Sequence, residues 1–277
     1  SFRAWENRSV TLLGMSGVGK TYLSSLLREH NWFHYSGDYR IGTRYLDEPI
    51  MDLIKQQAMQ VPFLRDLLRR DWIYIRNNIK VDDLGPVLSF VGKLGNPELG
   101  GVPLDEFSRH QALYRDAEIK AMRDVPEFTR KAREIYGYQH FVNDVGGSLC
   151  ELDEPSVIEL LVEHTLILYI KVTDREEEQK LIERAQSDPK PLYYRPEFLA
   201  EQLEVYLREN GLAYAAQMDP DAFTRWVFPR LFHSRIPRYE AIAGPHGYTV
   251  TSREVAQVRD EGDFLELLET AIARGGV

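Results

Sequence analysis

Cysteine is almost absent from this sequence, since Cys150 is the only one among 277 residues. A single thiol excludes a disulfide framework within the chain and a metal site built from several thiolates. Long apolar runs are also missing, because Glu159, Glu163 and His164 interrupt the most apolar stretch, residues 157–172. We therefore expect no membrane-spanning segment. The opening residues SFRAWENRSV have no apolar core typical of a signal peptide, so a cytoplasmic location is expected.

Positive charge is in short supply as well, because 43 Asp and Glu outnumber 34 Lys and Arg and give a net charge of −9. Non-specific binding to nucleic acid needs the opposite excess, so the composition argues against a nucleic-acid partner. One local exception is a basic cluster of Arg65, Arg69, Arg70, Arg76 and Lys80. This cluster is either a solvated helix face or a set of phosphate contacts.

Short apolar runs alternate with helical patterns along the chain. Runs typical of buried strands cover residues 9–13, 32–36, 140–145, 165–172 and 248–252. Helical patterns cover residues 21–28, 49–60, 62–70, 104–123, 126–136, 174–185, 195–209, 221–232 and 264–273, and another begins near residue 154. This alternation predicts an α/β fold, a three-layer sandwich around a mostly parallel five-stranded sheet. Residues 1–277 are expected to form one domain, with residues 46–137 as a helical insertion lobe.

The sequence GMSGVGKT, residues 14–21, matches the Walker A pattern G-x-x-x-x-G-K-[ST] between a predicted strand and a predicted helix. Glycines let the backbone approach phosphate oxygens, and the N-terminus of the following helix adds partial positive charge. The Lys20 amine would reach the β- and γ-phosphates, and the Thr21 hydroxyl would ligate Mg²⁺. The sequence predicts a site for ATP and Mg²⁺, made by Gly14, Met15, Ser16, Gly17, Val18, Gly19, Lys20, Thr21 and Tyr22.

Two carboxylates follow predicted strands. Asp38 comes after the second strand, where it either accepts a proton from an attacking hydroxyl, holds a water on Mg²⁺, or forms an Asx turn. Asp144 ends the third strand and is expected on the Mg²⁺ side. Gly146 and Gly147 follow it, and they either admit a substrate close to the backbone or form a simple turn.

Several basic residues are candidates to act together with these two carboxylates. Arg184 lies on a charged predicted helix and Lys190 in the loop beyond it, so residues 174–192 are expected to form a lid over the transferring phosphoryl group. The alternative is a surface helix of paired charges. Arg40 and Arg44 lie close to Asp38 in the sequence, so we expect an anionic acceptor there. Arg65, Arg69 and Arg70 are candidates for closing over it.

The order of these motifs resembles shikimate kinase and its gluconate-kinase-like relatives, in the nucleoside-monophosphate-kinase-like group of P-loop proteins. After the Walker A loop, the resemblance is carried by GDYRIG, VGGSLCEL, LILYIKV, ERAQSDPKPL and RYEAIAGPHGYTVTSREV. It implies ATP-dependent phosphoryl transfer to a small hydroxyl-bearing molecule. It also implies roles for particular residues: Asp38 as the catalytic carboxylate, Gly146 and Gly147 at the substrate, Arg184 on the lid, Lys190 at the acceptor and Arg253 near adenine.

The chain departs from that family in three places. Val145 stands where a third glycine is expected, and Lys190 replaces an arginine whose bidentate fork lysine cannot reproduce. Residues 46–137 displace the shikimate-binding segment. The resemblance therefore carries over the fold and phosphoryl transfer, but not shikimate as the substrate. The whole chain also resembles bacterial P-loop ATPases of unknown role, and this resemblance does not indicate an acceptor.

Three other functions remain open from the sequence. Residues 144–147 satisfy the D-x-x-G pattern of a GTPase switch, although the chain has no N-K-x-D to read guanine. A remodelling ATPase would carry an acidic pair at the end of its Walker B strand, whereas Val145 follows Asp144. A kinase acting on a nucleotide, a nucleic-acid end or a protein would use the basic cluster to grip phosphates.

Overall fold

A five-stranded sheet forms the centre of the molecule, for which a computed structural model describes residues 4–275. The first three residues of the stretch tested for a signal peptide therefore lie outside the description. The strands are β1 (Ser9–Leu13), β2 (Trp32–Ser36), β3 (His140–Asp144), β4 (Leu166–Lys171) and β5 (Gly247–Thr251), in the order β2-β3-β1-β4-β5. Every neighbouring pair is parallel. The predicted α/β class is confirmed, and the sheet is wholly rather than mostly parallel.

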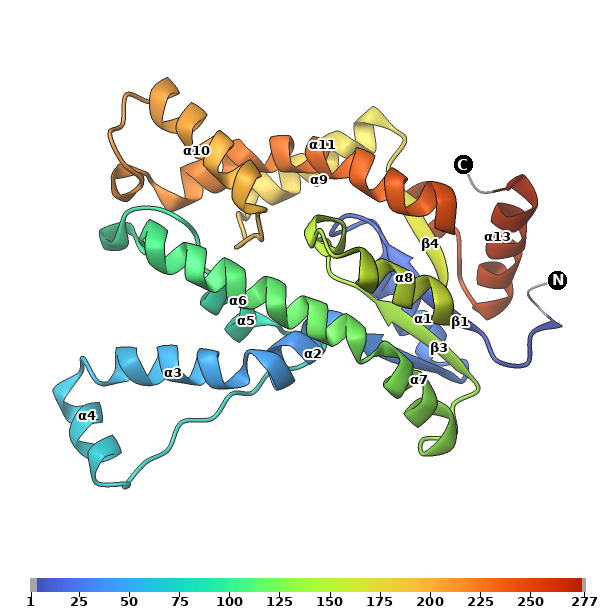
Figure 1. The fold of residues 1–277 in the computed structure, drawn as a ribbon, viewed down its shortest axis with the longest axis horizontal. Coiled ribbons are helices and arrows are strands. Elements are labelled where there is room, and N and C mark those ends of the chain that lie inside the picture. Colours follow the sequence, from blue (N-terminus) through green and yellow to red (C-terminus); the bar gives the residue numbers. More distant parts are fainter. Residues whose placement is uncertain (1–3, 276–277) are drawn as a thin grey trace.

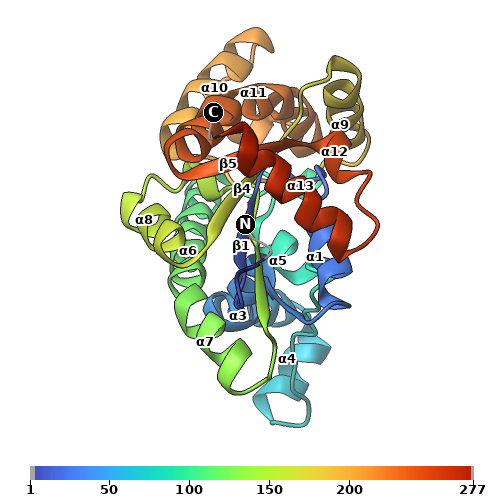
Figure 2. The same cartoon turned by 90° about the vertical axis from the view of Figure 1, so that its right-hand side faces the viewer.

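Helices cover both faces of the sheet, as is usual for parallel strands (Figure 1). Figure 2 shows α1 (Lys20–Arg28) and α13 (Glu261–Arg274) on one side, with α7 (Val125–Glu134) and α8 (Pro155–His164) on the other. The long α11 (Pro220–His246) contacts β4 and β5. The remaining helices are α2 (Gly37–Arg40), α3 (Asp47–Ala58), α4 (Pro62–Arg69), α5 (Gly85–Val91), α6 (Leu104–Arg123), α9 (Arg175–Ser187), α10 (Pro196–Glu209) and α12 (Ser252–Val255). Among the described residues, no helix is long and apolar enough to cross a bilayer.

Residues 46–137 contribute no strand to the sheet, and their helices fall into two groups. The first group, α3 and α4, projects away from the sheet (Figure 1). The second group belongs to the main body, because Ala117 and Met122 of α6 and Val125 of α7 share one buried cluster with the strands. Ile50 of α3 belongs to the same cluster, whereas α4 has no buried residue, so only the α4 end of this segment stands apart from the sheet and its covering helices.

A second apolar cluster ties α6 to α10 and α11. Phe107, Phe223 and Leu231 are fully buried in it. Beside this cluster, the Gln111 side chain accepts a hydrogen bond from the Tyr194 amide at 2.8 Å and donates one to the Leu192 carbonyl at 3.2 Å. The loop between α9 and α10 is thereby fixed against α6.

Besides the four-residue α2 and α12, which no pattern predicts, two helices differ from the sequence pattern. The pattern predicts a helix over residues 221–232, but α11 continues to His246 through Pro229, Pro237 and Pro245. An internal proline costs about 3 kcal/mol in an isolated helix. Burial of residues such as Tyr239 offsets that cost, because packing supplies most helical stability in proteins. The other helix, α5, is not among the helical patterns of the sequence, and it begins at Gly-Pro, where proline suits a first helical turn.

Candidate active site

Three neighbouring strands bring the predicted site residues to one edge of the sheet. Because β2, β3 and β1 are adjacent and parallel, their carboxyl ends lie together, where α/β proteins bind ligands. The glycine loop follows β1, Asp38 follows β2, and Asp144 ends β3. These segments surround a cavity of about 310 Å³, which we call the phosphate cavity. Its lining is Ser16, Gly17, Gly19, Lys20, Thr21, Tyr22, Asp38, Asp144, Val145, Gly147 and Arg184.

The glycine loop has a conformation that other residues would resist. Gly17 and Gly19 adopt φ values of 90° and 107°, in the region that L side chains rarely enter. A Cβ on Gly19 would also lie 2.8 Å from the Val255 side chain of α12. Directly after the loop, α1 begins at Lys20. The loop therefore brings a helix N-terminus, which attracts anions, to the phosphate cavity.

Lys20 is held inside this loop. Its ammonium donates to the Gly14 carbonyl at 2.7 Å and the Met15 carbonyl at 2.9 Å. Burial lowers the pKa of Lys20, while the charges of Asp144 and Asp38 raise it. The side chains of Met15 and Val18 are buried in the core, and neither these two residues nor Gly14 is among those that line the cavity. A compact cation thus stands at the base of the cavity, with two carboxylates near it.

Thr21 and Asp144 form the oxygen-rich side of the cavity. The Thr21 hydroxyl donates to Asp144 Oδ2 at 2.9 Å, and His34 Nε2 lies 3.5 Å from the same oxygen. Within residues 4–275, no three His, Cys, Asp or Glu side chains come together as a metal site. Mg²⁺ is commonly held by one or two carboxylates together with phosphate oxygens and waters. The paired oxygens of Thr21 and Asp144 fit that requirement, and Asp38 lies along the same cavity.

Asp38 has an environment that favours its neutral form. Burial raises the pKa of Asp38 to about 6, and the charge of Asp144 adds to this effect. Lys20 acts in the opposite direction, as does the Tyr114 hydroxyl, which donates to Asp38 Oδ1 at 3.3 Å. A carboxyl with a pKa near 6 is ionised at pH 7 and accepts a proton more readily than an ordinary aspartate.

A second cavity, of about 120 Å³, adjoins the first, and we call it the acceptor cavity. Its polar lining comprises Ser16, Asp38, Tyr114, Ser148 and Arg235, and its remaining walls are Leu84, Val87, Leu88, Val91, Gly147, Pro191, Leu192 and Tyr193. Ser16, Asp38 and Gly147 line both cavities. The Asp38 carboxyl therefore lies at the junction of the two.

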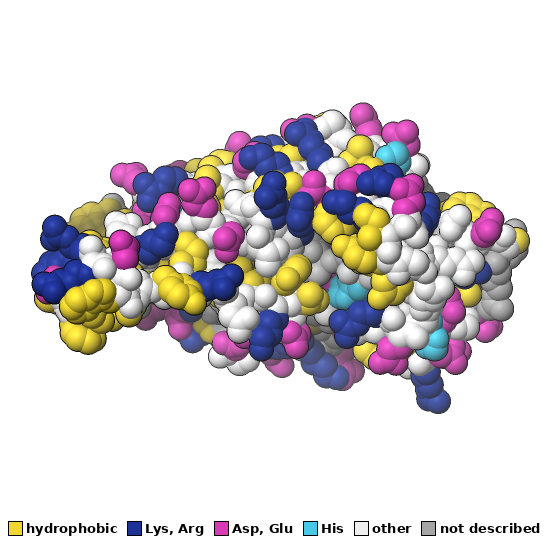
Figure 3. All heavy atoms as spheres, turned by 90° about the horizontal axis from the view of Figure 1, so that it is seen from below, with side chains coloured by type: hydrophobic (Ala, Val, Ile, Leu, Met, Phe, Trp, Pro, Cys, Tyr) yellow, Lys and Arg dark blue, Asp and Glu magenta, His cyan; other side chains and the backbone are white. Residues whose placement is uncertain are grey.

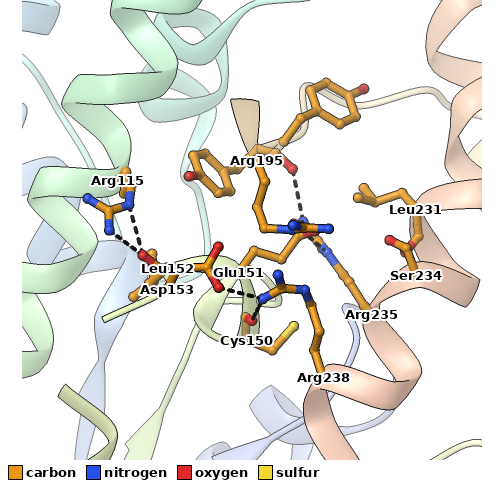
Figure 4. A network of polar contacts seen from close by, with 12 residues as sticks. Arg115, Cys150, Glu151, Leu152, Asp153, Arg195, Leu231, Ser234, Arg235 and Arg238 are labelled. Atoms are coloured by element: carbon orange, nitrogen blue, oxygen red, sulfur yellow. Dashed lines mark hydrogen bonds and ion pairs between the residues drawn. The ribbon is translucent and has the colours of Figure 1, made fainter. Parts of the chain in front are cut away.

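Arg235 is a buried cation of the acceptor cavity that sequence reasoning missed. Its Nε and Nη2 donate to Glu151 Oε2 at 2.9 and 2.6 Å, and Nη2 also donates to the Tyr193 carbonyl at 2.9 Å. Arg195 approaches the other Glu151 oxygen at 3.5 Å (Figure 4). Nη1 of Arg235 lies on the side of Gly147, which lines both cavities. Two guanidinium groups share one carboxylate, so the cluster keeps a positive charge next to the acceptor cavity.

Glu118 is a second buried carboxyl beside Asp38. Ser148 donates to Glu118 Oε2 at 2.6 Å, and burial raises the pKa of Glu118 to about 8. A Cβ on Gly146 would lie 2.9 Å from Asp38 Oδ1 and 3.1 Å from Glu118 Oε1. Glycine at residue 146 therefore leaves room for both carboxyl groups.

Glu118→Gln is expected to raise stability at alkaline pH relative to the wild type. Because the pKa of Glu118 is near 8 in the folded protein and near 4.5 in an unfolded chain, the folded state binds more protons between these values. The free energy of unfolding therefore falls as pH rises through this range. The variant should gain about 1 kcal/mol or more on the wild type between pH 6 and pH 9, measured by urea unfolding. The same gain in Glu159→Gln, on the exposed side of α8, would contradict this origin.

Of the two predicted lid cations, Arg184 and Lys190, only Arg184 lines the phosphate cavity. It also lies close to Gly17. Lys190 is exposed, 3.7 Å from Asp188, and lines a neighbouring cavity of about 200 Å³ together with Arg184. Arg184 is therefore the cation of this segment that faces the phosphate cavity directly.

Three other predicted contacts lie elsewhere. Arg40 Nε donates to Asp124 at 2.7 Å, and its guanidinium lies 4.8 Å from the centre of the Phe128 ring. Arg44 is exposed and lines neither cavity. Arg253 is exposed on α12 and pairs with Asp174. Although α12 packs against the glycine loop, Arg253 does not line the phosphate cavity.

The basic cluster also lies apart from the site. Arg65 and Arg69 are on α4, and Arg70 follows its end. None of the five cations of this cluster lines the phosphate cavity or the acceptor cavity. The wall that residues 46–137 provide for the acceptor cavity comes instead from Leu84, from α5 and from Tyr114 of α6.

The strand, glycine loop and helix around Lys20 define an α/β domain with the architecture of a P-loop protein. No protein-family model and no curated protein sequence matches the chain. Among solved structures, it is similar to shikimate kinase from Bacteroides thetaiotaomicron, with a TM-score of 0.41 and 14% sequence identity. The alignment covers 96% of this chain and 95% of that chain. A likeness this distant carries no argument about activity, so the case for a function rests on the cavities themselves.

Proposed function

We propose that this protein transfers the γ-phosphoryl group of ATP to a hydroxyl of a small anionic acceptor. The observation that carries the proposal is the position of Asp38 at the junction of the phosphate and acceptor cavities. Phosphoryl transfer to a bound hydroxyl needs an acceptor site next to the γ-phosphate and a group that orients or deprotonates the hydroxyl. A nucleotide switch or a motor has no need for the second cavity.

The phosphate cavity supplies the groups that a triphosphate requires. We assign the phosphates to the backbone amides of residues 17–21 and the Lys20 ammonium. Thr21 and Asp144 would hold Mg²⁺, which supplies charge neutralisation at the phosphate oxygens. Arg184 lines the same cavity and adds positive charge where negative charge develops during transfer.

In the proposed reaction, the acceptor hydroxyl gives its proton to Asp38. The hydroxyl oxygen forms a bond to the γ-phosphorus while the bond from that phosphorus to the β–γ bridging oxygen breaks, and ADP leaves. Tyr114 donates to Asp38 and so fixes the orientation of its carboxyl group. The pKa of Asp38 near 6 keeps it ionised and ready to accept the proton at neutral pH.

The acceptor class follows from the walls of the acceptor cavity. Arg235 is a buried cation there, held by Glu151 in a cluster that keeps a net positive charge. Buried guanidinium groups favour carboxylate or phosphate partners. Val87, Leu88 and Leu192 make much of the remaining wall apolar. We therefore propose a compact hydroxy acid or phosphate ester with an apolar portion.

Product analysis with γ-labelled ATP tests the proposal. Label should move to an organic product when the protein is incubated with Mg²⁺ and a pool of small hydroxy acids and sugar phosphates. Release of free phosphate alone, unchanged by the pool, would favour an ATPase and contradict the kinase. Replacing ATP with GTP separates the switch, because a GTPase would turn over GTP in preference.

Arg184→Ala is expected to lower the rate of transfer about 100-fold, since removing one preorganised donor to developing charge has an effect of this order. The dissociation constant of ATP should change little, because the loop and Lys20 remain. Rapid-quench measurement of a single turnover checks the rate. Lys180→Ala is the matched control, because Lys180 is exposed on the same helix and paired with Glu176 at 2.7 Å. Equal transfer rates in the two variants would show that Arg184 has no role in the transfer.

A further inference from the structure

The projecting end of the molecule exposes large apolar side chains. Phe63, Trp72 and Tyr74 are 71%, 67% and 80% exposed, and Val61 is also exposed. They come from three pieces of backbone: the approach to α4, α4 itself and the extended segment after it. None of the residues of α4 is buried, although the helix has one apolar and one basic face. We call residues 61–80 the tip.

The tip is also a basic segment of an acidic protein. It holds five basic residues against two acidic ones, in a chain of net charge −9. Arg70 lies 5.0 Å from the centre of the Trp72 ring. Among the described residues, none of the five cations is paired with a carboxylate, whereas exposed Lys120 and Arg130 are. Figure 3 shows hydrophobic side chains beside Lys and Arg side chains at this end of the molecule.

We propose that the tip binds the surface of an anionic lipid membrane. Amphipathic helices with Arg or Lys on one face and Phe, Leu or Trp on the other bind in this way, with their apolar face at the headgroup boundary. Trp and Tyr are the side chains that favour the same depth. Each basic residue near an anionic surface adds to the attraction. The negative remainder of the chain is screened beyond a Debye length of about 8 Å in physiological salt.

Two features favour a lipid surface over other anionic partners. The apolar side chains Leu64, Leu67 and Leu68 on α4 would contribute nothing to binding the phosphates of a nucleic acid, whereas the acyl chains of a lipid membrane accommodate them. A protein partner that takes a helix in a groove reads one continuous stripe of anchors. In the tip, the exposed apolar side chains come from separate segments of backbone and do not form one stripe. A fluid lipid surface can accommodate such an arrangement.

Vesicle co-sedimentation of the full chain tests this proposal. We expect binding to vesicles of equimolar phosphatidylglycerol and phosphatidylcholine, and little binding to phosphatidylcholine alone. The triple variant Phe63→Ser, Trp72→Ser, Tyr74→Ser should bind about tenfold more weakly or worse. Arg65→Gln, Arg69→Gln, Arg70→Gln should lose a similar amount together with most of the salt dependence. Turnover of ATP without vesicles should be unchanged in both variants, which shows that they are folded.

The control removes three comparably exposed side chains elsewhere, as Leu99→Ser, Tyr136→Ser, Tyr214→Ser. If this variant loses vesicle binding to the same degree, the tip is not the site. Failure of the wild type to bind anionic vesicles overturns the proposal. It is also overturned if the tip variants abolish binding of a single-stranded oligonucleotide, or dimerisation in sedimentation velocity, while vesicle binding is absent.

Discussion

Lys20→Ala is expected to abolish turnover of ATP while the protein stays folded. Among the described residues, Lys20 and Arg184 are the two cations that line the phosphate cavity, and the Lys20 ammonium is the one that donates to carbonyls of the glycine loop. In the proposed reaction its loss removes a charge assigned to the transferring group, which is expected to cost about 1,000-fold in rate. Burial lowers the pKa of Lys20, so keeping this side chain charged costs the folded state free energy, and its removal should not unfold the protein.

The measurement combines a labelled-ATP assay with a thermal unfolding curve for each variant. Thr21→Ser is a matched control in the next residue, because it keeps the hydroxyl that donates to Asp144, whereas Thr21→Val removes it. We expect the serine variant to retain most activity and the valine variant to lose it. A wild-type rate in Lys20→Ala would remove the basis for placing any nucleotide in this cavity.

The sheet could be predicted from the sequence because its signals are local. Each strand is a short apolar run, and the glycine loop identifies the strand that precedes it. The alternation of strands and helices then determines the class of the fold. What this local pattern could not predict was α5 and the second half of α11. Gly85 and Pro86 in one case, and three prolines in the other, are breakers by themselves, and only burial in the folded protein overrides them.

The candidate site was predictable only where residues follow the ends of adjacent strands. Lys20, Asp38 and Asp144 meet for that reason. Arg40 illustrates the limit, because residues two apart on a helix point in nearly opposite directions. The Arg40 side chain therefore lies on the side of the helix away from Asp38 and donates to Asp124.

Other site residues depend on contacts between distant parts of the chain. Glu118 and Ser148 are 30 residues apart, and Arg235 and Glu151 are 84 apart. Neither pair lies within a recognisable motif. The one available signal is a charged residue among apolar ones, such as Arg235 between Phe232 and Tyr239 on a buried helix face. That signal predicts a buried cation, but it does not predict which cavity the cation lines.

Asp38→Asn is expected to lower the rate of phosphoryl transfer about 100- to 10,000-fold, the range for losing a general base. The amide has nearly the same shape as the carboxylate, but it cannot take the proton of the acceptor hydroxyl. The affinity for ATP should change little, because Lys20, Thr21 and Asp144 are untouched. Asp116→Asn is the control, since Asp116 lies exposed on α6, two residues from Tyr114.

The pH dependence identifies the role of the Asp38 carboxyl more sharply than the rate alone. Its pKa is raised to about 6, so the carboxyl is protonated below that pH and ionised above it. The wild-type transfer rate should therefore rise as pH increases through about 6 and then level off. In Asp38→Asn the residual rate should not rise there. Loss of ATP binding in this variant would assign Asp38 to the metal, whereas an unchanged rate and profile would exclude it as the base. Because Asp38 alone among the carboxylates lines both cavities, a flat profile at the wild-type rate would also leave the acceptor cavity without a group to activate its hydroxyl.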